Sequence, residues 1–157
     1  MPNHEKSIVV IFYPKRIIIA TRIGDKYGSV WTRTDRLTIL QVEVSDEELG
    51  NVALRHLELS VIREIPTEEH RDLRERYCKL TKFKTEGQAM KDSKMVSVYL
   101  AKNKIRLEPK ENRYSQVRRH YYEYLGMPEA KFEIDYPCTL TQIGLALREA
   151  SKKCLIT

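Results

Sequence analysis

The residues best suited to chemistry lie in a short basic and aromatic segment in the second half of the chain. Residues 118–124 read Arg-Arg-His-Tyr-Tyr-Glu-Tyr. A histidine placed between arginines and tyrosines could serve a ribonuclease as acid or base. That reaction needs a second acid or base, and the sequence does not show that Glu123 or another group is in place. A non-catalytic role for His120 is favoured, as part of a solvated basic segment beside half-buried aromatic residues.

The same segment is well suited to binding. Arginine and tyrosine are enriched at the energetic centres of protein interfaces, and arginine also grips phosphates or carboxylates with two hydrogen bonds. Lys102, Lys104 and Arg106 alternate across a predicted hairpin, so they would share one face and could adjoin residues 113–122. The alternative is a solvated sheet face whose lysines protect an edge strand. The predicted binding face comprises Lys102, Lys104, Arg106, Arg118, Arg119, His120, Tyr121 and Tyr122.

The charge of the chain supports an anionic partner. The net charge is +6, but residues 71–120 hold 15 basic and 6 acidic side chains, while the flanking residues together are slightly acidic. A patch of this kind attracts anionic partners through long-range steering. The partner could be a nucleic acid or a protein with an acidic face.

Familiar catalytic and metal-binding spacings are absent. The six glycines form no phosphate-binding motif, and the sequence has neither H-E-x-x-H nor a close Cys/His cluster. No cofactor, metal or enzymatic activity is therefore expected. The three cysteines are widely spaced and contain no C-x-x-C pair, which is typical of reduced thiols in a cytosolic protein. No apolar run has the length of a membrane span or a secretion signal, so a cytoplasmic location is expected.

Hydrophobic patterning predicts several strands. Apolar runs at Ile8–Phe12 and Lys15–Thr21 predict two strands joined tightly at Pro14. Residues 23–35 contain two glycines and are expected to be loop or irregular strand. Further strands are predicted at Leu37–Val44, in a hairpin turning near Asn103, and at Lys131–Asp135. For Tyr121–Leu125, strand and helix both remain open.

Helices are predicted where caps precede apolar residues at helical spacing. Ser45 and Glu48 form a capping box before a helix that buries Leu49, Val52, Ala53, Leu57 and Leu59. On this helix His56 is expected to be a packing residue. Thr67 is expected to cap a second helix that packs through Leu73, Tyr77 and Leu80, and Thr85–Ser93 is expected to be a loop.

A second capping box, Thr139 with Gln142, begins the last predicted helix. Both boxes are followed by an apolar residue and a glycine, Gly50 and Gly144, at an offset of 94 residues. Each glycine costs its helix roughly 1 kcal/mol relative to alanine, so its repetition suggests close approach of the backbone to the sheet. The sequence therefore predicts a single α+β domain over residues 1–157. It has a mostly antiparallel sheet packed by about three helices, with a possible internal duplication of a strand and capped-helix unit.

Three segments carry a resemblance to a known family. Ser45–Gly50, Lys104–Pro109 and Thr139–Ala150, in this order among the strands, resemble the small immunity proteins of bacterial contact-dependent growth inhibition (CDI). The resemblance implies a non-enzymatic, cytoplasmic inhibitor that binds the C-terminal domain of a cognate toxin, often a nuclease. Inhibitors of basic nucleases are often acidic, so the basic residues 71–120 fit poorly with the interpretation of the chain as an inhibitor of a nuclease toxin. A basic nucleic-acid-binding protein is the alternative.

Overall fold

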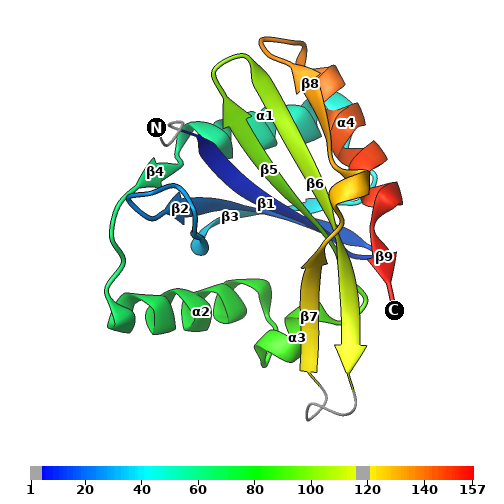
Figure 1. Cartoon of the computed structure of the whole chain (residues 1–157). Coiled ribbons are helices and arrows are strands. Elements are labelled where there is room, and N and C mark those ends of the chain that lie inside the picture. Colours follow the sequence, from blue (N-terminus) through cyan, green and yellow to red (C-terminus); the bar gives the residue numbers. More distant parts are fainter. Residues whose placement is uncertain (1–4, 116–120) are drawn as a thin grey trace.

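The computed structural model describes residues 5–115 and 121–157, which form one mixed sheet with helices on both faces (Figure 1). The strands are β1 (Lys6–Phe12), β2 (Arg16–Gly24), β3 (Trp31–Gln41), β4 (Val61–Ile62), β5 (Lys94–Ala101), β6 (Lys104–Ser115), β7 (Tyr121–Gly126), β8 (Phe132–Asp135) and β9 (Leu155–Ile156). Their order is β3-β2-β1-β5-β6-β7, with β4 beside β2 and both β8 and β9 beside β6. Within the described residues only β4 and β9 pair in parallel, so the predicted, mostly antiparallel α+β fold is confirmed.

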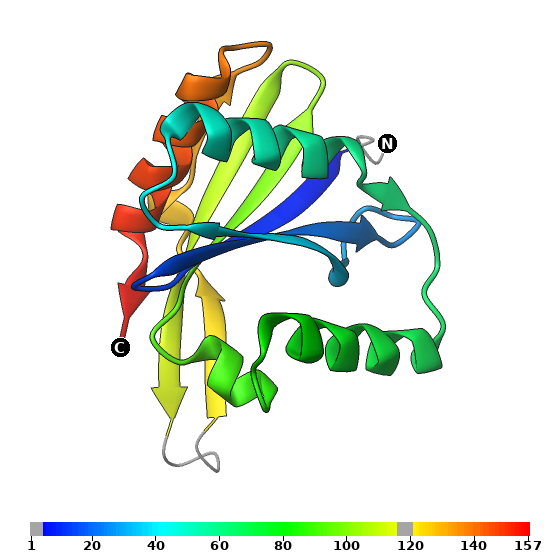
Figure 2. The ribbon, with the colours of Figure 1, turned by 180° about the vertical axis from the view of Figure 1, so that it is seen from behind.

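The helices are α1 (Asp46–Glu58), α2 (Thr67–Thr81), the short α3 (Glu86–Met90) and α4 (Leu140–Lys153), with a 3-10 turn at Pro128–Ala130. Figure 2 shows α1 and α4 side by side against the upper part of the sheet, with α2 below. No helix in the described part of the chain has the length and apolar character needed to span a membrane.

Strands β1 and β2 are apolar on both sides because both sheet faces are covered. Ile8 and Val10 alternate with Val9 and Ile11 along β1. The first pair faces α1 and α4 in the larger core, and the second pair lies in a smaller core with Tyr77 of α2. A continuous apolar run is the expected signature of a strand buried on both faces.

The repeated glycines mark a close crossing of α1 and α4. A Cβ atom at Gly50 would lie 1.9 Å from the carbonyl oxygen of Leu140, and one at Gly144 would lie 1.9 Å from that of Asp46. The two contacts are reciprocal, since each glycine meets the residue four positions before the other. The predicted close approach is therefore present, but it was assigned to the wrong partner: the glycines bring two helices together, not a helix and the sheet.

The two predicted capping boxes differ in the structure. Thr139 accepts a hydrogen bond from the Gln142 amide at 3.1 Å, and the Gln142 side chain accepts one from the Thr139 amide at 2.9 Å. Ser45 accepts from the Glu48 amide at 3.1 Å, but the Glu48 carboxylate turns toward Arg55, with N and O atoms 3.8 Å apart. The first helix thus has half of the predicted box.

Several other predicted boundaries were wrong. Strand β3 begins at Trp31, within the expected loop, because an edge strand can hold polar residues on its exposed positions. Residues 86–90 form α3, with the Thr85 side chain accepting from the Gln88 amide at 3.1 Å. Pro66, not Thr67, occupies the N-cap of α2.

Two side chains expected in helix cores are exposed. Leu59 is the C-cap of α1 and is 45% exposed, while Leu80 on α2 is 51% exposed. Thr81 is buried in its place and donates its hydroxyl hydrogen to the Tyr77 carbonyl at 2.6 Å. Residues 121–126, for which two interpretations were open, form strand β7.

Candidate functional site

The structure divides the predicted binding face between the two ends of β6. Lys102 lies in the turn before β6, and Lys104 and Arg106 are the first and third residues of β6. Strand β7 lies beside the other end of β6 (Figure 1), and there Tyr122 pairs with Tyr114. Ten residues of strand separate Lys104 from Tyr114, which is roughly 33 Å, so the expected adjacency of the two groups is not found.

The structure does not describe the side chains of four predicted residues. Arg118, Arg119 and His120 lie outside the described residues. Tyr121 is placed by its backbone as the first residue of β7, opposite Ser115. Their role in binding stays a prediction.

The basic residues at the beginning of β6 are ion-paired. Lys104 Nζ lies 2.5 Å from Asp135 Oδ1 on β8, and this hydrogen bond raises the pKa of Lys104. The Arg106 guanidinium donates to Glu108 at 2.7 Å and to Glu5 at 3.1 Å. These carboxylates neutralise most of the positive charge of the strip, which fits the solvated sheet face considered as the alternative. The edge-strand part of that alternative is wrong, because β5 and β8 pair with β6 on both sides at these residues.

The other end of β6 is aromatic and is tied to the rest of the fold. The rings of Tyr114 and Tyr122 lie 4.7 Å apart between centroids. Asn112 donates its side-chain amide to the Met90 carbonyl at 2.6 Å. The Thr157 amide donates to the Asn112 carbonyl at 2.9 Å, which extends the pairing of β9 with β6. The aromatic end is thus anchored to β9 and to the segment before β5.

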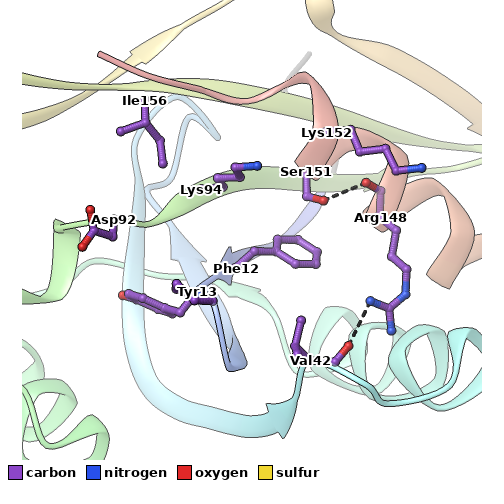
Figure 3. A pocket seen from close by; sticks show the side chains of 10 residues that line it. Phe12, Tyr13, Val42, Asp92, Lys94, Arg148, Ser151, Lys152 and Ile156 are labelled. Atoms are coloured by element: carbon purple, nitrogen blue, oxygen red, sulfur yellow. Dashed lines mark hydrogen bonds between the residues drawn. The ribbon is translucent and has the colours of Figure 1, made fainter.

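A hollow of about 530 Å³ opens beside this anchored region (Figure 3). Four parts of the chain line it: the β1–β2 turn, the β3–α1 connection, the start of β5, and the end of α4 with β9. We call it the cationic hollow and define it by Phe12, Tyr13, Val42, Asp92, Lys94, Arg148, Lys152 and Ile156.

Arg148 holds two walls of the cationic hollow together. Its guanidinium donates to Asp46 Oδ1 at 2.7 Å and to the Val42 carbonyl at 3.1 Å, and it also contacts the Val44 carbonyl. These bonds join α4 to the connection between β3 and α1 (Figure 3). Arg148 is therefore fixed in place before any partner arrives.

The two lysines of the cationic hollow are much less compensated. Lys152 Nζ lies 3.8 Å from Glu149, with both side chains more than half exposed. Such a pair contributes little energy. Lys94 forms no ion pair with any described residue, and Asp92 is the only carboxylate among the lining residues. The hollow is therefore a net cationic surface with an apolar floor.

Sequence patterns did not reveal the cationic hollow. Phe12, Val42, Lys94, Lys152 and Ile156 come from distant segments, and no spacing links them. The one usable signal was the apolar run that ends at Phe12, two residues before Pro14. Their proximity depends on the sheet order, which the sequence did not specify.

His56 has the packing role that was predicted for it. Its Nδ1 lies 2.9 Å from Thr21 Oγ1 and its Nε2 lies 2.7 Å from Thr38 Oγ1. Burial lowers the pKa of His56, and Arg55 adds to this effect. A neutral ring held between two hydroxyls is structural. No group of three or more His, Cys, Asp or Glu side chains suited to a metal occurs among residues 5–115 and 121–157.

Comparison with known proteins gives a consistent result. The chain is similar in fold to a protein of unknown function from Neisseria meningitidis, with TM-score 0.79, 17% identity and 98% of each chain covered. It is also similar to a CdiA-CT/CdiI toxin and immunity complex from Yersinia pseudotuberculosis, with TM-score 0.74, 16% identity, and 96% of this chain and 97% of that chain covered. A search of curated proteins finds no match. The model of the CdiI family, CDI immunity protein, matches residues 6–154. The chain therefore belongs to the CDI immunity protein family, as its sequence resemblance predicted.

Proposed function

We propose that this protein binds the C-terminal toxin domain of a CDI system in the cytoplasm and neutralises it, and that the toxin is a nuclease. The observation that carries the proposal is the family match over residues 6–154. The similar fold of the Yersinia pseudotuberculosis toxin and immunity complex supports it. The immunity protein acts by occupying toxin surface and performs no reaction of its own.

The architecture favours inhibition by contact. The two cores fix the sheet from both sides, and α1 and α4 are locked together at their glycines. A rigid surface loses little conformational entropy on binding, so more of the contact energy appears as affinity. Of the predicted binding face, we propose that Tyr122 and its neighbours at the aromatic end contact the toxin, because the strip from Lys104 to Arg106 is already satisfied by carboxylates.

Co-purification tests the proposal. The protein is expressed with the C-terminal domain of the large secreted protein that we expect the neighbouring upstream gene to encode. We expect a stable one-to-one complex and loss of the domain's nuclease activity on RNA or DNA. The same chain without the toxin should bind RNA weakly at physiological salt. RNA binding without toxin binding would instead establish the nucleic-acid-binding alternative.

Two controls separate the finer parts of the proposal. A domain that binds but leaves RNA and DNA intact contradicts the nuclease assignment and leaves neutralisation by contact in place. Toxin recovered from the complex in denaturant, then refolded alone, should regain full activity with an unchanged mass. A permanent change in toxin mass would show that this protein acts by chemistry.

A further inference from the structure

We propose that the cationic hollow is a docking site for an acidic segment of the toxin domain, and that this segment inserts one apolar side chain. The inference rests on the proposed function and names the chemistry of the partner segment. It also assigns a use to positive charge that remains uncompensated in the fold.

The floor of the hollow provides the apolar half of the site. Among the lining residues, Phe12 is only 8% exposed, whereas Ile156 is 49% exposed. Tyr13 and Val42 also line the hollow and add apolar surface near Phe12 (Figure 3). A volume of about 530 Å³ falls in the range of sites that bury most of a small ligand, about 300–1,000 Å³. It therefore has room for a large apolar side chain and its neighbours.

The rim provides the charged half of the site. Lys94 comes from the start of β5 and Lys152 from the last turn of α4, so the two ammonium groups approach the hollow from different elements. Arg148, also on α4, is turned toward the β3–α1 connection, where its carboxylate partner is Asp46. Since Asp46 compensates Arg148, the charge offered to a partner is that of Lys94 and Lys152, against the single lining carboxylate of Asp92. Charge complementarity thus selects an acidic occupant, since a basic one would be repelled.

The walls are held in place without a partner. Arg148 is fixed by its three acceptors, and Ser151 donates to the Arg148 carbonyl at 2.7 Å. The Tyr13 hydroxyl donates to the Ala89 carbonyl, which ties the β1–β2 turn to α3. The hollow is therefore preformed for the toxin segment that the proposed function requires.

Paired variants test the charged half. The hollow variant combines Lys94→Glu with Lys152→Glu. The control variant combines Lys79→Glu with Lys91→Glu, which changes the total charge equally at exposed positions outside the hollow. Affinity for the upstream-encoded toxin domain is measured by calorimetry at low and high salt. We expect the hollow variant to bind at least about 100-fold more weakly and to lose most of the salt dependence. The control pair should stay within about threefold of the wild type.

The apolar half has a matched control in the neighbouring residue. Leu155 and Ile156 are adjacent on β9 and are 50% and 49% exposed, but only Ile156 lines the hollow. Ile156→Asp should weaken toxin binding by at least about tenfold, and Leu155→Asp should change it by less than about threefold. Thermal unfolding of each variant confirms that the fold is retained.

The outcomes separate this inference from the proposed function. If the wild type fails to bind the toxin domain, the proposed function itself is wrong. If the wild type binds and neutralises it but both hollow variants bind as tightly as their controls, only the docking site is wrong. If the hollow variants lose affinity for RNA but keep their affinity for the toxin, the hollow binds nucleic acid and the inference is overturned as well.

Discussion

The close crossing of α1 and α4 makes a strong prediction about Gly50 and Gly144. Replacing either glycine with alanine adds a methyl group that would lie 1.9 Å from a backbone carbonyl oxygen of the other helix. Ordinary contact requires at least 3.4 Å, so the helix axes must separate locally by about 1.5 Å. Backbone atoms cannot rotate away as a flexible side chain can. The helices must therefore move apart.

The energetic cost follows from the packing that this movement disrupts. Overpacking a core costs typically about 1–3 kcal/mol and occasionally more. A gap of 0.5–1 Å already removes roughly a quarter to a half of the dispersion energy of each contact. The higher helix propensity of alanine offsets only about 1 kcal/mol of this cost. The contact here is with backbone, so the overpacking cost should reach about 3 kcal/mol or more, and the net loss in the free energy of unfolding should be about 2 kcal/mol or more for each single variant.

Urea denaturation followed by circular dichroism measures this cost. Gly87→Ala is the control, because its added methyl would meet nothing nearer than 3.8 Å. It should change stability by less than about 1 kcal/mol, or raise it. The double variant Gly50→Ala with Gly144→Ala should cost less than the sum of the single variants, since the first methyl already separates the helices. Single variants as stable as the wild type, or strictly additive losses, would refute the crossing geometry.

Three further predictions concern other parts of the molecule. Because His56 has a lowered pKa in the fold, its contribution to stability is fully present above the unfolded pKa of about 6.5 and is lost as the pH falls below it. The melting temperature should therefore drop more between about pH 7.5 and about pH 5.5 in the wild type than in His56→Gln; equal drops would contradict the neutral ring. Arg148→Met should lower the free energy of unfolding by about 2 kcal/mol, measured in urea, because it leaves the Val42 carbonyl and the Asp46 carboxylate without their donor; Lys152→Met, which breaks only an exposed pair, is the comparison. Lys102→Glu should leave toxin affinity within about threefold, whereas Tyr122→Ala should weaken it by about tenfold or more in the same binding assay; the opposite order would place the contact at the other end of β6.

Local signals in the sequence located most elements correctly. The apolar runs around Pro14 became β1 and β2, and the turn near Asn103 joins β5 to β6. Thr139 and Gln142 form the complete capping box expected of them. These features depend on residues within a few positions of one another, so local sequence patterns are sufficient to predict them.

Features that depend on tertiary pairing were missed. The first half of β3 has no apolar alternation, because its partner β2 supplies the hydrogen bonds and its other edge tolerates charge. Lys104 and Arg106 looked like a free basic strip, since Asp135 and Glu5 are far away in the sequence, and alternation along a strand does not show that Glu108 turns back to pair with Arg106. The cationic hollow combines four separate segments. None of these could be inferred without knowing which strands are neighbours.

The assembly of the cationic hollow from distant segments also links binding to folding. The hollow is complete only when the β1–β2 turn, the start of β5, α4 and β9 are all in their native places. A partner seated there binds the native state and not the unfolded chain, so it stabilises the native state by about 4 kcal/mol when its free concentration is about 1,000 times its Kd. Protein that holds toxin would accordingly survive cellular proteases longer than protein that does not, and toxin supply would set the amount of immunity protein that persists.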